Sequence, residues 1–197
     1  MMKTNYKKDG FLIIDDFLPL EIVNKLEYFY SIEKGWSYID QVRENHYKHV
    51  FKTESSFFPN EDETYLARFS RSETLEDNYV NEVFEDFFKP KLRELSESNL
   101  LEFDTRCYKL DEGDFYRTHM DDYAGTIGCV YYLNKRWSWD WGGILHIGTD
   151  DDSLTSIFPK FNRLVVHDMK KFRFPHFISP ITNYAKQSRY TIVSFNK

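Results

Sequence analysis

The sequence is poor in the features that mark secreted, membrane or nucleic-acid-binding proteins. It has only two cysteines, Cys107 and Cys129, too few for a disulfide framework. No apolar run approaches the length that spans a membrane, and the lysines between Met1 and Asp9 precede no stretch long enough for a signal peptide. Acidic side chains outnumber basic ones by 32 to 26, so no basic surface for nucleic acid is expected. These absences predict a cytoplasmic protein with no membrane or nucleic-acid partner.

Low-complexity segments, internal repeats and linkers are missing too, while rings and apolar side chains are plentiful. Aromatic residues make up 18% of the chain and hydrophobic residues 41%, which is a globular composition. A length of 197 residues suits one domain with a sizeable core better than two. We therefore expect a single domain over residues 1–197, with a strand and helices in 1–100 and a β-rich core in 101–197.

The first half of the chain shows strand and helix patterns. Residues 10–15 form an apolar run that predicts a buried strand. Apolar side chains recur at helical spacing over residues 20–30 and again over residues 75–88, where Pro90 should bend or break the helix. Residues 36–70 lack clear periodicity and are expected to form loops and short strands.

The second half consists of short β-rich runs separated by turn residues. These runs are 103–110, 115–121, 126–134, 143–148, 153–158, 163–168, 176–181 and 189–196. Eight such strands after a helical half predict a mainly β fold with packed helices around a double-stranded β-helix, a jelly-roll or cupin-like core. The helices are needed to cover an apolar sheet face that would otherwise be exposed.

A candidate metal site combines His119-Met120-Asp121 with the distant His176. Successive side chains of a strand point to opposite faces, so His119 and Asp121 share one face. His176, at the start of a late strand, would add a second imidazole. Two histidines and one carboxylate form the facial set that non-heme Fe(II) oxygenases use, so we predict that these three residues bind metal.

Other ligands and another metal compete with this prediction. His146 and His167 also lie on predicted strands. Zinc is the main rival metal for two histidines and a carboxylate, although the sequence contains no HExxH helix of a zinc hydrolase. The choice between iron and zinc therefore depends on a basic residue near the end of the chain.

That residue is Arg189, which shares a strand face with Thr191. An arginine on the inner face of a barrel is costly to bury unless a carboxylate matches its charge, and the Thr191 hydroxyl could add a hydrogen bond. The partner is either an acid of the protein or a dicarboxylate that also chelates the metal, a description that 2-oxoglutarate fits. An ordinary strand-edge arginine is the structural alternative, and Lys186, in the preceding turn, is the competing basic residue.

Several blocks of sequence carry a family resemblance. They are Tyr116–Asp121, Cys129–Lys135 with Trp137, Gly142–Leu145, Pro159–Leu164, Pro175–His176 with Pro180, and Arg189–Ile192. In order and spacing these blocks resemble Fe(II)/2-oxoglutarate-dependent dioxygenases of the prolyl 4-hydroxylase-like superfamily, in particular the oxygen-sensing HIF prolyl hydroxylases and their microbial relatives. The likeness runs from Cys107 to Phe195, nearly half of the chain, and Gly10–Leu18 resembles the family's entry strand.

The resemblance implies roles for individual residues. The residues that would hold Fe(II) are His119, Asp121 and His176. Arg189 would pair with the far carboxylate of 2-oxoglutarate, Tyr132 would hydrogen-bond the same carboxylate, and Tyr108 would line the co-substrate pocket. Tyr131 competes with Tyr132, because alternation lets only one of them face inward. O2 is the second co-substrate that the resemblance implies, and ascorbate is a candidate additional cofactor.

The implied reaction is hydroxylation of an unactivated C–H bond, with conversion of 2-oxoglutarate and O2 into succinate and CO2. Related halogenases lack the carboxylate ligand, so Asp121 favours hydroxylation. By closeness of motif the first expected substrate is a prolyl residue of a protein or peptide. The alternative is free proline, another amino acid or a small metabolite. A non-catalytic metal-binding module is the alternative from another class.

The sequence also departs from the family pattern. Phe195 stands where relatives often have tryptophan, and residues 124–128 lack the arginine that the oxygen sensors place near their substrate. Trp137, Trp139 and Trp141 crowd one loop, which either covers the cavity mouth as a lid or only caps the jelly roll.

Overall fold

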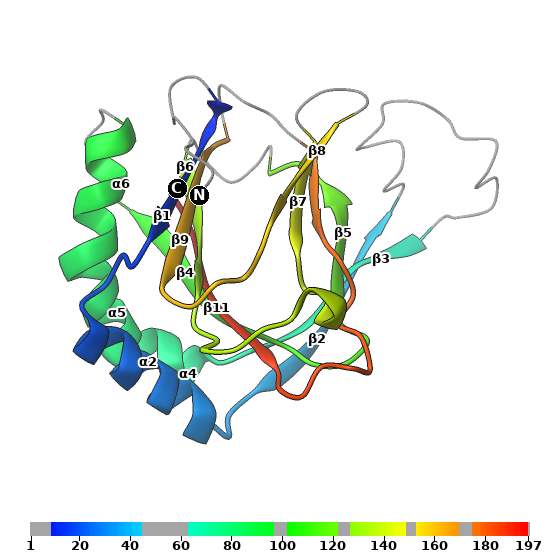
Figure 1. Ribbon diagram of the computed structural model, residues 1–197, viewed down its shortest axis with the longest axis horizontal. Coiled ribbons are helices and arrows are strands. Elements are labelled where there is room, and N and C mark those ends of the chain that lie inside the picture. Colours follow the sequence, from blue (N-terminus) through cyan, green and yellow to red (C-terminus); the bar gives the residue numbers. More distant parts are fainter. Residues whose placement is uncertain are drawn as a thin grey trace.

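Two facing β-sheets with helices on one outer side make up the computed structural model of the chain (Figure 1). The structure describes residues 9–44, 63–96, 102–121, 127–148, 153–169 and 175–196. The strands are β1 (Phe11–Asp15), β2 (Ser37–Glu44), β3 (Glu63–Arg71), β4 (Phe103–Leu110), β5 (Phe115–His119), β6 (Ile127–Tyr132), β7 (Leu145–Gly148), β8 (Leu154–Ile157), β9 (Arg163–Asp168), β10 (His176–Ile178) and β11 (Arg189–Asn196). The helical segments are α2 (Leu20–Ile32), α4 (Glu73–Leu75), η1 (Glu76–Val80), α5 (Asn81–Val83), η2 (Phe84–Phe88), α6 (Lys89–Ser96) and η3 (Trp139–Trp141).

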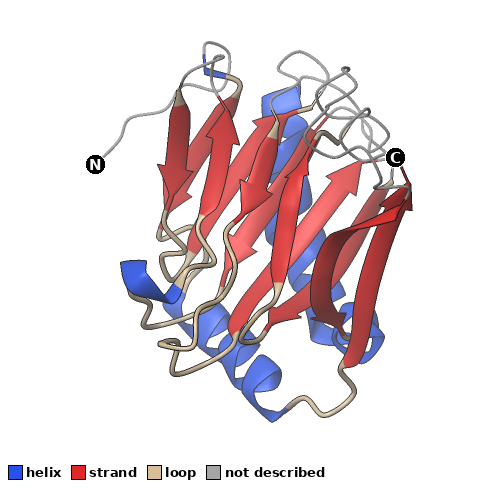
Figure 2. Ribbon diagram, turned by 90° about the vertical axis from the view of Figure 1, so that its right-hand side faces the viewer, coloured by secondary structure: helices blue, strands red, loops and turns tan. Residues whose placement is uncertain are grey.

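The strands follow jelly-roll order. They form one hydrogen-bonded path, β1-β9-β6-β11-β4-β3-β5-β10-β7-β8, with β2 paired to β3. This path folds back on itself, so that β9, β6, β11 and β4 face β5, β10, β7 and β8 (Figures 1 and 2). The prediction of a mainly β, double-stranded β-helix core is confirmed.

The helices cover the outer face of the sheet that contains β11 (Figure 1). Tyr30 of α2 and Phe88 of η2 are fully buried against this sheet, where they meet Tyr131 and Ile192. Burying a large apolar side chain contributes roughly 1.5–3 kcal/mol, so this interface is a main source of stability. Because alternate side chains of the same strands point the other way, the inner faces are left to line the space between the sheets.

The second helical stretch differs from the sequence prediction. The helical segments from Asn81 to Ser96 continue through Pro90, so Pro90 does not break the helix, which was one of the two effects predicted for it. The turn Phe84–Phe88 is π-helical, with the Lys89 N–H donating to the Phe84 carbonyl. A proline lacks the N–H of a normal helical turn and its ring crowds the preceding turn, and a widened turn just before it relieves both problems.

Residues 36–70 also differ in part from expectation. β2 and β3 pair as antiparallel strands of eight and nine residues, longer than the short strands predicted, while residues 45–62 lie outside the described residues. None of the helices in the described part of the chain is both long and apolar enough to cross a membrane.

Candidate active site

A cavity of about 750 Å³ lies between the two sheets and is lined by inner-face side chains of both. Its walls include the three predicted metal ligands and Arg189. The sequence-predicted site residues therefore share one space, although they come from strands far apart along the chain.

The three candidate metal ligands come together where β5 ends and β10 begins. β10 pairs antiparallel with β5, which places His176 opposite His119. Nε2 of His119 lies 3.4 Å from Oδ1 of Asp121, and Nε2 of His176 lies 3.3 Å from Oδ2. One ligand atom from each residue lies within 4.8 Å of the others, close enough for all three to hold one ion.

Hydrogen bonding and charge prepare these groups for a cation. Nδ1 of His119 lies 2.7 Å from the Arg117 carbonyl oxygen, so an Nδ1–H can donate there and leave the Nε2 lone pair toward Asp121. Burial lowers the pKa of the His119 imidazole. Burial acts to raise the pKa of the Asp121 carboxyl, but the charge of His176 and contacts with the surrounding imidazoles hold it well below its ordinary value. A neutral imidazole beside an ionised carboxylate is the charge state that metal binding requires.

The structure separates the two competing histidines. His146 points to the outside of its sheet, where its Nδ1 lies 2.9 Å from the Ser156 hydroxyl and its ring stacks on Phe177. His167 of β9 lines the cavity instead, with Nε2 3.5 Å from Oδ2 of Asp121 and no hydrogen-bond partner among the described residues. The alternation of side chains along β9 could have predicted that His167 faces the cavity. It could not have predicted that His167 lies close to Asp121.

Arg189 lies at the other end of the cavity with its charge unmatched. It is 1% exposed, its guanidinium carbon lies 5.0 Å from the centre of the Tyr132 ring, and none of the described acids forms an ion pair with it. Its Nε and Nη2, the Tyr132 hydroxyl and the Thr191 hydroxyl have no hydrogen-bond partner in the described part of the chain. Burial lowers the pKa of Arg189 and raises that of Tyr132. Buried polar groups are normally satisfied, so four unsatisfied ones gathered here fit an anionic ligand.

The remaining residues named from sequence are also placed. Tyr132 faces the inside, whereas Tyr131 faces the helices and its hydroxyl lies 2.6 Å from Oδ1 of Asn162. Tyr108 is buried and lines the cavity. Lys186 is exposed in the turn before β11, which excludes it as the buried anchor.

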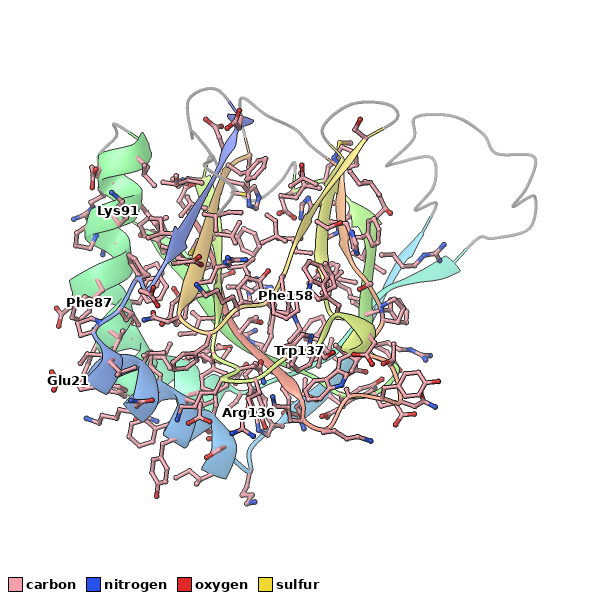
Figure 3. The ribbon with its side chains drawn as sticks, viewed as in Figure 1. Glu21, Phe87, Lys91, Arg136, Trp137 and Phe158 are labelled. Atoms are coloured by element: carbon pink, nitrogen blue, oxygen red, sulfur yellow. The ribbon has the colours of Figure 1, made fainter. Side chains whose placement is uncertain are left out.

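The tryptophan loop does not form a lid over the metal ligands. None of its three tryptophans lines the cavity, and Trp137 donates its indole N–H to the Gly142 carbonyl at 2.8 Å. The loop precedes Leu145, which pairs with Ile178, whereas His176 lies at the far end of β10. It therefore caps the end of the jelly roll away from the ligands, where Figure 3 labels Trp137.

Comparison with known proteins gives a sequence match and shared folds. Residues 104–196 match the family model described as the 2OG-Fe(II) oxygenase superfamily. No curated protein sequence matches the chain significantly. The chain is similar in structure to a prolyl hydroxylase from Trichoplax adhaerens, solved in complex with a hypoxia inducible factor oxygen degradation domain peptide fragment, at 17% identity and a TM-score of 0.65 over 97% of this chain and 84% of that one.

Two further solved structures have the same fold. A prolyl-4-hydroxylase from Pseudomonas putida is 18% identical, with a TM-score of 0.61 over 98% of this chain and 94% of that one. An oxidoreductase of the 2OG-Fe(II) oxygenase family from Burkholderia pseudomallei is 8% identical, with a TM-score of 0.65 over 96% of this chain and 86% of that one. The segment that carries the histidine pair, the carboxylate and the buried arginine, residues 104–196, thus belongs to the 2OG-Fe(II) oxygenase superfamily.

Proposed function

We propose that this protein is an Fe(II)- and 2-oxoglutarate-dependent dioxygenase that hydroxylates an unactivated C–H bond. The observation that carries the proposal is the pairing of two features in one cavity. At one end, His119, Asp121 and His176 converge, and at the other Arg189 is buried with no counter-ion among the described residues. A keto acid with a distant carboxylate needs both features at once.

The residues present fit both groups. Two imidazoles and a carboxylate suit Fe(II) and leave adjacent coordination positions for other ligands. Bound iron would supply activation of O2 coupled to the oxidative decarboxylation of 2-oxoglutarate. Arg189 would receive the far carboxylate, with the Tyr132 and Thr191 hydroxyls donating to it. Apolar side chains that line the cavity, such as Val193 and Ile178, would exclude water from the reacting groups.

The substrate proposed from motif likeness is a prolyl unit. Its support is the resemblance across residues 107–195 and a fold shared with prolyl hydroxylases, one of them solved with a peptide bound. A free amino acid is the second candidate, and the cavity wall offers a specific observation in its favour. A cytoplasmic location, which would keep iron and both buried cysteines reduced, is also part of the proposal.

The reaction is tested by following succinate formed from 2-oxoglutarate in the presence and absence of Fe(II). We expect Fe(II)-dependent succinate, its loss in Asp121→Ala together with loss of metal binding, and no loss in Asp40→Ala, an exposed acid that does not line the cavity. Hydroxylation would appear as a 16-dalton mass gain in a prolyl peptide or an amino acid. Tight iron binding without any succinate would instead favour a non-catalytic metal-binding module.

A further inference from the structure

We propose that Asp104 and Arg106 form a subsite for the charged main-chain groups of a free amino acid. This inference rests on the proposed oxygenase function and deepens it, because it chooses a zwitterionic small molecule over a residue inside a peptide. The substrate's carboxylate would bind the Arg106 guanidinium, and its ammonium group would lie beside Asp104.

The two residues lie on the cavity wall in line with the co-substrate anchor. Asp104, Arg106 and Tyr108 alternate along β4 and all three line the cavity. In the pairing with β11, Tyr108 lies opposite Thr191, while Arg106 lies opposite Val193. Each two-residue step along a strand covers about 7 Å, so the pair lies one to two steps further from Arg189 than the hydroxyls that would hold the keto acid.

Arg106 presents a guanidinium with N–H groups still available. Its Nε and Nη2 donate to Oδ2 of Asp104 at 3.1 and 2.5 Å, and its Nη1 donates to the Tyr108 hydroxyl at 3.3 Å. A guanidinium has five N–H donors, so two of them, one on each terminal nitrogen, have no acceptor among the described residues. Asp104 occupies the edge formed by Nε and Nη2, so a carboxylate would approach the remaining N–H groups on Nη1 and Nη2. The side chain is 37% exposed and lines the cavity, so the guanidinium is not enclosed by protein.

The side chains around Asp104 and Arg106 argue against a purely structural role for this ion pair. On the neighbouring strands β11 and β6 the inward side chains at the same level are apolar: Val130, Val193 and Phe195. A partly buried ion pair gains little stability, since desolvation offsets the attraction and apolar residues would serve as well or better. A cation and an anion side by side do match a molecule whose carboxylate and ammonium share one carbon. A prolyl residue inside a peptide carries neither charge.

Binding without turnover tests the subsite directly. Under anaerobic conditions, with Fe(II) and 2-oxoglutarate bound, calorimetry would compare free amino acids, beginning with L-proline, against the uncharged N-acetyl-L-prolinamide. We expect an amino acid to bind at least tenfold more tightly than its neutral analogue. Arg106→Met should remove this difference in affinity. Arg106→Lys should keep part of it, because lysine retains the positive charge but not the planar guanidinium that binds a carboxylate through two N–H groups.

Two more variants separate local chemistry from general effects. Asp104→Asn should weaken amino-acid binding and leave the neutral analogue unaffected. Arg68→Met serves as the matched control, because Arg68 pairs with Asp40 at 3.0 Å, is 38% exposed and does not line the cavity. Its binding of amino acids should equal that of the unmodified protein.

Turnover distinguishes failure of this inference from failure of the oxygenase assignment. Absence of Fe(II)-dependent succinate with every substrate would reject the oxygenase, while the binding data would still judge the subsite. Succinate stimulated equally by peptide and amino acid would reject the subsite alone. The same holds if no amino acid binds, or if Arg106→Met weakens charged and neutral ligands alike.

Discussion

Replacing Arg189 with methionine should stabilise the protein and abolish its response to 2-oxoglutarate. Methionine keeps much of the arginine's aliphatic volume and removes Nε and Nη2, two nitrogen donors that lack partners in the part of the chain that the structure describes. An unsatisfied buried donor costs about 1–3 kcal/mol, so the upper limit of the gain is about 6 kcal/mol. Water entering the cavity would satisfy part of this need, and we expect about 2 kcal/mol. For a chain of this size that corresponds to a rise in Tm of about 6 °C.

Binding of 2-oxoglutarate should reverse the order of stability, so that the unmodified protein becomes more stable than the Arg189→Met variant. At a 2-oxoglutarate concentration 100 times Kd, binding adds about 2.7 kcal/mol to the unmodified protein. The Arg189→Met variant should gain almost nothing, because the far carboxylate has lost its cation. Urea denaturation with anaerobic Fe(II) is the suitable assay, since guanidinium would itself compete for carboxylates. Arg163→Met is a control that should lower the stability of the protein. It removes the ion-pair partner of Asp15, whose Oδ1 lies 2.7 Å from Nε of Arg163.

A loss of stability in Arg189→Met, with the response to 2-oxoglutarate retained, would refute the reasoning. It would mean that the guanidinium is satisfied within the protein and that the keto acid binds elsewhere.

Three further predictions concern the surroundings of the site. His167→Ala should lower metal affinity by about 10–100-fold, measured by Co(II) titration, because the imidazole lies 3.5 Å from Oδ2 of Asp121 and helps to lower the pKa of that carboxyl. Gly143→Ala should raise the KM for 2-oxoglutarate, because the new Cβ would lie 2.7 Å from Cδ of the buried Arg189. Gly113→Ala is the control: Gly113 also has a positive φ, but its Cβ would have no atom within 4 Å, so the change should lower stability without changing the KM. Asp15→Asn should destabilise the fold by about 1–3 kcal/mol at neutral pH. The hydrogen bond from Arg163 lowers the pKa of Asp15, so its contribution is full above pH 3.8 and is lost as the pH falls through the lowered pKa; an acid titration of Tm should show this loss only in the unmodified protein.

The parts of the site that sequence could predict are those governed by alternation within one strand. Arg189 and Thr191 share a face of β11 because they are two residues apart, and Asp121, two residues after His119, lines the same cavity although β5 ends at His119. The cost of burying a guanidinium then predicts a carboxylate partner for Arg189, either an acid of the protein or a ligand. The pairing of these two local patterns in one cavity came from the family resemblance, which residues 104–196 now bear out as a sequence match.

The parts that sequence could not predict depend on the register between strands. The position of His167 beside Asp121 follows from the pairing of β9 with β6 and the closing of the two sheets. The alignment of Arg106 with Val193 is likewise set by the pairing of β4 with β11. Pro90 shows a different limit, because a widened turn absorbs a residue that local rules assign to a helix end.

The register of β11 links stability to function. Its inward positions carry Arg189 and Thr191, while its outward positions carry Tyr190 and Ile192, which pack beneath the helices. A shift of one residue would move the guanidinium into the aromatic layer and would turn apolar side chains toward the keto acid. Both faces of β11 therefore disfavour a one-residue shift in register. On the outer face the shift would lose packing and bury a charge, and on the inner face it would remove the anchor for the keto acid. β11 tolerates an arginine whose charge none of the described acids matches, because packing on the other face of the strand fixes its register.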